Sequence, residues 1–122
     1  MLVLLGVAAN DSERDARELV SRIAHLRIFA DAAGRMNLDL SAVGGELLVV
    51  SQFTLLADTR GGRRPSFSGA AAPDEARALY QRFLALCREA SLRVAEGEFG
   101  ADMDVELVNQ GPVTLILDTR GA

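Results

Sequence analysis

Residues 46–56 read Glu-Leu-Leu-Val-Val-Ser-Gln-Phe-Thr-Leu-Leu, and this stretch decides the fold. The run Leu47–Val50 is apolar at every position. Because successive side chains of a strand point to opposite faces, both faces of this run need to be covered. We therefore expect a long strand over Glu46–Leu56 at the centre of a sheet. Polar residues enter at Ser51 and Gln52, where the apolar run stops.

The segments around this strand predict two helices and several further strands. Ser12 and Asp15 stand at capping-box spacing, and the apolar residues that follow recur at helical intervals, so we expect an amphipathic helix over residues 12–28. Pro73 opens a second amphipathic helix that ends near Leu92. The other strands are expected at Leu2–Val7, Met36–Leu40, Arg93–Glu96, Val105–Asn109 and Val113–Thr119. This order predicts an α+β (α/β-like) fold in a single domain, residues 1–122, with two amphipathic helices packed against a mixed β-sheet or partial barrel.

The composition narrows the function classes. With 122 residues, 49% hydrophobic and 25% charged, the chain is typical of a small globular protein. A net charge of −4 argues against a broad nucleic-acid surface. No apolar run approaches the roughly 18 residues that a membrane helix needs, so we expect no membrane partner.

The cysteine and histidine content restricts the chemistry further. The single Cys87 excludes an intrachain disulfide and fits a reducing cytoplasm, where we place the protein. Its position on an apolar helix stripe predicts packing, with reactivity as the alternative. The single His25 excludes a multi-His metal site within one chain. We expect His25 at the surface or its boundary, with catalysis as the alternative.

Residues 57–72 predict a long loop rich in glycine, arginine and serine. Loops of this length in compact domains are usually functional or disordered. Arg60, Arg63 and Arg64 lie within it, with no acid between them. The two interpretations are a local anion site and a solvated basic loop.

Ser51-Gln52-Phe53-Thr54 places polar groups where a buried strand ends. If the strand continues, Ser51 and Phe53 face one way while Gln52 and Thr54 face the other, so the latter pair could meet a ligand together. Both side chains donate and accept hydrogen bonds without carrying charge. Such a site has no strong general base and must work by positioning or by the substrate's own groups. The alternative is that these residues only cap strand ends.

Asn109-Gln110-Gly111-Pro112-Val113-Thr114 interrupts two strand-like runs. Proline cannot donate to a ladder and has a fixed φ, while glycine reaches dihedrals that are closed to other residues. A tight, fixed turn at Gly111-Pro112 therefore reconciles the interruption with the strand pattern that resumes at Val113. Thr114 adds a further hydroxyl just past the turn.

The two polar stretches together resemble the signature motifs of the D-aminoacyl-tRNA deacylases, the bacterial and eukaryotic type also called D-Tyr-tRNA deacylases. The resemblance covers essentially the whole chain in order. It continues through Leu26–Phe29, Met36–Leu38, Ala57–Arg60, Gly62–Phe67 and Phe99–Met103. Members of this family remove D-amino acids, and also glycine, from mischarged tRNA, acting as homodimers without a metal. The resemblance therefore implies an ester hydrolase that needs tRNA and a second copy of the chain, and no metal or cofactor.

The resemblance also implies residue roles. Gln52, Phe53 and Thr54 form the catalytic centre, and Ser51 helps to line the pocket for the terminal adenosine and the ester. Gly111-Pro112 holds a cis peptide bond and reaches into the partner subunit's pocket, where its carbonyl oxygens exclude L-side chains.

Further implied roles concern the walls of the pocket and the tRNA backbone. Phe99 and Met103 shape the pocket, and Thr114 supports the Gly-Pro loop. Asn109 and Val113 complete the substrate-binding set. Arg60, Arg63 and Arg64 are the candidates for contacts to tRNA phosphates.

Three hypotheses follow for the chemistry. The family mechanism relies on the ribose 2′-hydroxyl beside the ester, which suits motifs without His, Cys or carboxylate. A small-ester hydrolase that uses Thr54 as nucleophile is the second hypothesis, although no partner base is visible. A non-catalytic module that binds the aminoacylated RNA end is the third.

The family normally carries further strands ahead of a segment like Leu2–Val7. We expect this chain to lack those N-terminal strands, which complete the sheet and part of the dimer contact. A weaker dimer is the expected consequence.

Overall fold

The central layer of the protein is a parallel sheet of three strands. The computed structural model describes residues 1–121 of the chain. Strands β1 (Leu2–Leu5), β4 (Leu47–Ser51) and β5 (Val94–Glu96) pair in the order β1-β4-β5, and both pairings are parallel. Val3 lies opposite Val49, and Leu47 lies opposite Val94. The prediction that the apolar run Leu47–Val50 forms the central strand is therefore confirmed.

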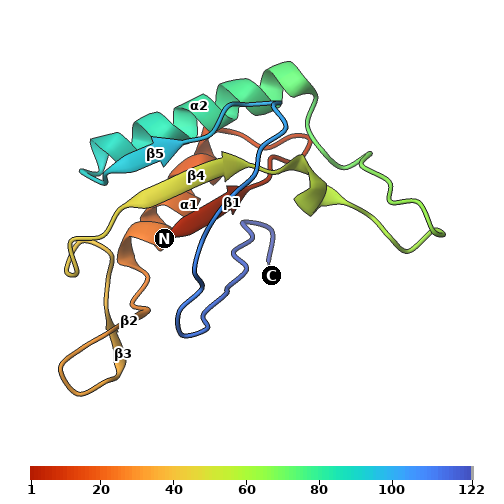
Figure 1. The fold of residues 1–122 in the computed structure, drawn as a ribbon. Coiled ribbons are helices and arrows are strands. Elements are labelled where there is room, and N and C mark those ends of the chain that lie inside the picture. The colour runs from red at the N-terminus through yellow and green to blue at the C-terminus, as the bar shows by residue number, and fades with distance from the viewer. Residues whose placement is uncertain (122) are drawn as a thin grey trace.

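Two helices cover one face of this sheet and pack against each other (Figure 1). Helix α1 spans Glu13–His25 and helix α2 spans Pro73–Glu89. The Ser12 N–H donates to Asp15 Oδ2 at 2.9 Å, as expected of a capping box. This hydrogen bond is the main reason why the pKa of Asp15 lies below its ordinary value, because it favours the carboxylate. Both predicted helices are confirmed, and each ends three residues before its predicted end.

The core lies between the helices and the sheet. Its most buried members are Tyr80, Phe83, Leu40, Leu47, Leu84, Val49 and Cys87. A buried tyrosine hydroxyl needs a hydrogen-bond partner, and the Tyr80 hydroxyl donates to the Val49 carbonyl oxygen at 2.8 Å. Cys87 is fully buried, and burial raises the pKa of its thiol to about 11. Its predicted packing role is thus confirmed, since such a thiol is a poor nucleophile near neutral pH.

A short antiparallel hairpin stands apart from the sheet. It joins β2 (Phe29–Ala30) to β3 (Met36–Leu38), with Phe29 opposite Leu38. Together with the parallel sheet and the two helices, it confirms the α+β fold class. In the described part of the chain, no helix combines the length and apolar character needed to cross a bilayer.

Residues 98–121 run across the other face of the sheet without forming a strand (Figure 1). The predicted strands Val105–Asn109 and Val113–Thr119 are therefore wrong for this structure. A strand needs a neighbour for its N–H and C=O groups, and no backbone ladder reaches these residues within residues 1–121. Most of their apolar side chains stay exposed, with Val108 at 91% and Ile116 at 81%, although Leu117 packs against the core.

We expect Leu84→Ala to lower the free energy of unfolding by about 2–5 kcal/mol, because it leaves a cavity in a close-packed core. Leu84 is 0% exposed. Urea unfolding at one fixed protein concentration measures the change. Val43→Ala is the control, since Val43 is 42% exposed and its truncation leaves the core intact. Equal midpoints for the two variants would contradict this view of the core.

Candidate functional site

The first polar stretch lies where β4 stops, at the carboxyl end of the central strand. The Gln52 N–H donates to the Leu5 carbonyl at 2.8 Å as the last bond of the β1–β4 ladder. The chain then turns into a 3₁₀ helix, η1, over Phe53–Leu56. The prediction that the strand continues to Leu56 is therefore wrong.

Gly6 explains why the chain can turn there. Just past β1, it lies against η1, and a Cβ added to it would be 2.6 Å from Leu56 Cδ2 and 3.3 Å from the Gln52 carbonyl oxygen. A residue larger than glycine would displace the Leu56 side chain and would require small shifts at Leu55 and Gln52. The close approach of two segments distant in sequence thus ends the strand at Ser51.

Gln52 and Thr54 meet although they do not lie on one face of a strand. The Gln52 side-chain amide donates to the Thr54 hydroxyl. The prediction that Gln52 and Thr54 lie on one face of a strand is therefore wrong, although the two side chains do lie together. Their hydrogen bond leaves the Thr54 proton available to donate onward, and no carboxylate or imidazole hydrogen-bonds the pair in the described chain.

Phe53 presents an aromatic surface beside this pair. Its side chain is 56% exposed, and its ring meets Phe67 edge to face with centroids 5.1 Å apart. Phe67 belongs to the resemblance but was given no role from the sequence. The only feature of the sequence that pointed to Phe67 was its position in the run Gly62–Phe67, which resembles the family. Two exposed aromatic rings can stack a base, because every base has a π-face.

The second polar stretch forms a self-contained loop. Its Gly111–Pro112 peptide bond is cis, as expected, and Gly111 has a φ of 140°. The Asn109 side-chain amide donates to the Thr114 hydroxyl at 3.2 Å, and the Val113 N–H lies 3.5 Å from Asn109 Oδ1. Asn109 and Thr114 thus close the loop around Gly111–Pro112.

The two polar stretches do not come together within one copy of the chain. The loop of residues 109–114 lies below the sheet, whereas η1 follows the carboxyl end of β4 (Figure 1). Each hydrogen bond of the loop is internal to it in the part of the chain that the structure describes. If both stretches act on one substrate, a second copy must supply one of them.

Phe99 and Met103 lie near the sheet rather than beside Gln52. Phe99 packs 6.0 Å from Tyr80, and the Arg77 guanidinium lies 4.9 Å above its ring. Met103 contacts Gly97, where an added Cβ would be 2.9 Å from its sulfur. Arg77 was missed by the sequence analysis because nothing in its helical position signals a ring beneath it.

The arginines of the loop are not equivalent. Arg60 forms a bidentate pair with Asp58, with both Nε–Oδ1 and Nη2–Oδ2 at 2.9 Å. Hydrogen bonds from the Arg60 side chain, and then from its backbone N–H, hold the pKa of Asp58 below its usual value. Arg63 and Arg64 are exposed and form no ion pair among the described residues. They are the cations best placed to meet an external anion.

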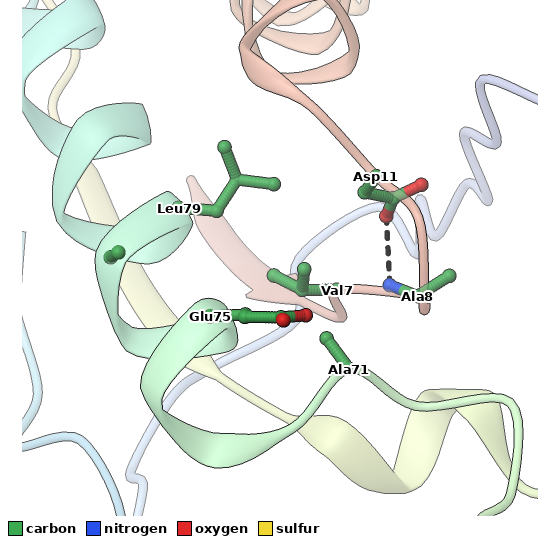
Figure 2. A pocket seen from close by; sticks show the side chains of 7 residues that line it. Val7, Ala8, Asp11, Ala71, Glu75 and Leu79 are labelled. Atoms are coloured by element: carbon green, nitrogen blue, oxygen red, sulfur yellow. Dashed lines mark hydrogen bonds between the residues drawn. The ribbon is translucent and has the colours of Figure 1, made fainter.

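Two hollows lie near these elements. An open depression of about 550 Å³ lies between η1 and the basic loop, lined in part by Leu55, Asp58 and Arg60. A smaller cavity of about 220 Å³ lies between the end of β1 and the start of α2, with Val7, Asp11 and Glu75 in its wall (Figure 2). None of the site residues predicted from the sequence lines the smaller cavity.

The comparisons with known proteins agree with the geometry. The model of the family described as D-Tyr-tRNA(Tyr) deacylase matches residues 1–118. The chain belongs to this family. The D-aminoacyl-tRNA deacylase of Anaeromyxobacter dehalogenans (strain 2CP-C) is 60% identical over 120 residues, which cover 98% of this chain and 80% of that relative.

Two solved structures have a similar fold. A protein described as "c-Myc DNA Unwinding Element Binding Protein" has a TM-score of 0.84 and 34% identity, and the match covers 92% of this chain and 76% of the other. A probable eukaryotic D-amino acid tRNA deacylase has a TM-score of 0.68 at 19% identity, over 83% of this chain and 74% of the other. The second likeness bears on the fold alone.

We expect Gly6→Ala to lower the free energy of unfolding by about 1–3 kcal/mol, since the added methyl group collides with η1. It should also shift the Phe53 and Thr54 resonances in an NMR spectrum. Gly61→Ala is the matched control, because a Cβ at Gly61 meets nothing within 4 Å. If Gly6→Ala were as stable as the control, the close packing of Gly6 against η1 would not contribute to stability.

Proposed function

We propose that the protein hydrolyses the ester bond of D-aminoacyl-tRNA and releases the D-amino acid and free tRNA. The observation that carries this proposal is the family match over residues 1–118, with the matched Gln52 and Thr54 hydrogen-bonded at the carboxyl end of the central strand. The relative from Anaeromyxobacter dehalogenans bears the name of this activity, D-aminoacyl-tRNA deacylase. We extend the proposal to glycine attached to tRNA-Ala, because a filter built to exclude an L-side chain also admits glycine.

The chemistry follows from an uncharged site. Water adds to the ester carbonyl, and the bond between that carbon and the ribose oxygen breaks, so the ribose oxygen leaves with a proton. The vicinal 2′-hydroxyl of the terminal adenosine is positioned to assist this proton transfer. Gln52 and Thr54 orient the ester by hydrogen bonds, and Phe53 stacks on the adenine. Ser51 lines the same end of the strand.

Stereochemical selection falls to Gly111–Pro112. A turn without large side chains presents carbonyl oxygens, which can reject an L-side chain by steric exclusion without reading its identity. Because the loop lies away from η1 in one chain, we infer that it acts in the pocket of a second copy. The exposed apolar residues of the same segment support this homodimer: Leu107 is 58% exposed and Leu115 is 55% exposed.

The tRNA backbone is assigned to the basic loop. Arg63 and Arg64 lack acidic partners among the described residues, whereas Arg60 is held by Asp58. A local contact of this kind is compatible with a chain of net charge −4, since only the acceptor end needs to be bound. The proposed site of action is the cytoplasm, where tRNA is charged.

Parallel incubation with D-Tyr-tRNA and L-Tyr-tRNA tests the proposal. We expect rapid release of D-tyrosine and little release of L-tyrosine. A tRNA that ends in 2′-deoxyadenosine should be hydrolysed slowly, because it lacks the assisting hydroxyl. Equal rates on the two enantiomers would contradict the proposal, and tight binding without turnover would identify a binding module instead.

We expect Thr54→Ala to retain kcat/KM for D-Tyr-tRNA within about tenfold, because it removes one neutral hydrogen bond and no nucleophile. Quenched time courses measure the rate. Capture of an acyl group on Thr54 in the unaltered protein, by mass spectrometry after acid quench, would establish the nucleophilic alternative.

We expect Arg63→Ala with Arg64→Ala to weaken tRNA binding and to flatten its salt dependence, by about one unit of log–log slope per lost phosphate contact. Binding titrations across salt concentrations give the slope. Arg35→Ala is the control, because the β2–β3 hairpin that carries it lies at the opposite end of the molecule from the basic loop (Figure 1). An unchanged slope would leave the basic loop as a solvated surface.

A further inference from the structure

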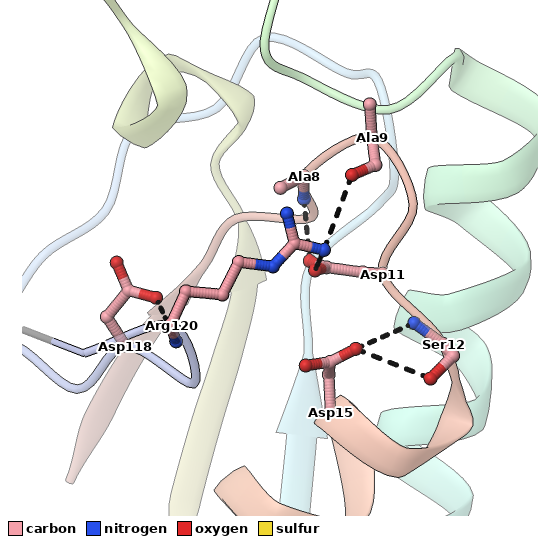
Figure 3. Close-up of polar contacts among 7 residues, drawn as sticks. All are labelled: Ala8, Ala9, Asp11, Ser12, Asp15, Asp118 and Arg120. Carbon is pink, nitrogen blue, oxygen red and sulfur yellow. Dashed lines mark hydrogen bonds and ion pairs between the residues drawn. The ribbon is translucent and has the colours of Figure 1, made fainter.

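The C-terminal tail is tied to helix α1 and to the turn that precedes it by polar contacts that none of the proposed roles uses; Figure 3 shows those of Arg120. Arg120 Nη2 lies 2.8 Å from Asp11 Oδ1 and 3.5 Å from the Ala9 carbonyl oxygen. Arg22 of α1 donates to the Asp118 carbonyl at 3.3 Å. Asp118 and Arg120 are thus held at opposite ends of α1, because Arg22 lies in its last turn and Asp11 precedes its first turn.

The ion pair is better built than the other surface pairs of the chain. The Asp11 side chain is 13% exposed, whereas the acidic partners in the remaining pairs are all at least 40% exposed. The same carboxylate is fixed from its other side, because Asp11 Oδ2 accepts the Ala8 N–H at 2.7 Å. Because each oxygen of this partly buried carboxylate has its own hydrogen-bond partner, the Asp11 side chain is held in one orientation. It can therefore fix the position of the arginine that it binds.

Asp11 joins the tail to the base of the basic loop. Ala8, which it holds, forms a bridge with Ala70, and the Ala9 N–H donates to the Gly69 carbonyl at 2.9 Å. The turn that follows β1 therefore contacts both the end of the basic loop and the tail.

The Gly111–Pro112 loop depends on its two ends for its position. Within the described chain, the hydrogen bonds of residues 104–116 are the two that Asn109 makes inside the loop. On the N-terminal side, Met103 packs on Gly97 and Phe99 packs on Tyr80. On the C-terminal side, Leu117 packs against the core and Arg120 reaches Asp11.

We propose that the Arg120–Asp11 ion pair is a positioning contact that fixes the Gly111–Pro112 loop relative to the end of β1 and the basic loop. Arg120 acts through the loop and does not touch the substrate. This inference rests on the proposed function, because the loop is taken to select the enantiomer. Loss of the pair should relax selection more than it weakens binding, since a displaced loop still leaves the Gln52 end of the site intact.

The test compares Arg120→Gln, Arg120→Lys and Asp11→Asn in the full chain. Asp11→Asn retains an oxygen for the Ala8 N–H while it removes the charge. Arg17→Gln is the matched control, because it breaks an ion pair of the same kind on the exposed side of α1, at 3.1 Å from Glu13. The readouts are kcat and KM for D- and L-Tyr-tRNA, and the ¹⁵N heteronuclear NOE of the Gly111 amide.

Arg120→Gln and Asp11→Asn should each lower the D-to-L ratio of kcat/KM by on the order of tenfold, as a misplaced group does, with KM for D-Tyr-tRNA nearly unchanged. The double variant should be no worse than the worse single variant, because both remove one interaction. Arg120→Lys should restore most of the ratio, and Arg17→Gln should leave it unchanged. The Gly111 NOE should fall in Arg120→Gln, while the Leu84 amide in the core keeps its value.

An unchanged D-to-L ratio or an unchanged Gly111 NOE in Arg120→Gln would overturn the inference. These results are distinct from failure of the proposed function. If the unaltered protein shows no preference for D-Tyr-tRNA, the proposed function fails, and the Gly111 NOE alone then decides whether Arg120 positions the loop.

Discussion

The parallel pairing of β4 with strands on both sides is the constraint on which the rest of the structure depends. Parallel neighbours cannot be joined by a tight turn, so each connection crosses the sheet, and both crossings contain a helix, α1 or α2. Both helices cover one face, against which Leu47 and Val49 are buried. The same pairing brings Ser51 and Gln52 to the carboxyl edge of the sheet, where ligands of open α/β sheets commonly bind.

The elements that could be predicted from the sequence are those fixed by local pattern. The apolar run Leu47–Val50 carried the signal of a doubly covered strand, and helical spacing with the Ser12–Asp15 cap placed α1. The turn into η1 could not be predicted, because it depends on Gly6 lying against Leu56, a contact between segments far apart in sequence. Gln52 and Thr54 were predicted to share one face of a strand, and the hydrogen bond between them arises instead from that turn.

The C-terminal region shows the other limit of sequence patterns. Residues 105–109 and 113–119 have the composition of strands, but composition does not supply a neighbour to pair with. Their exposed apolar side chains fit a surface that a second copy would cover. The Arg120–Asp11 pair spans 109 positions and has no local signature, so the tie that holds this region was visible only in the structure.

A site shared between two copies is tested most directly by a mixed dimer. One chain carries Gln52→Ala and the other carries Pro112→Ala, with different affinity tags so that the mixed pair can be isolated. Each two-fold symmetric dimer has two sites, and mixing restores one in which both stretches are unaltered. About half of the unaltered rate on D-Tyr-tRNA is then expected together with the unaltered D-to-L ratio, whereas the Gln52→Ala dimer is slow and the Pro112→Ala dimer has lost the ratio. A mixed dimer with the low D-to-L ratio of the Pro112→Ala dimer would show that the two stretches do not act across the interface.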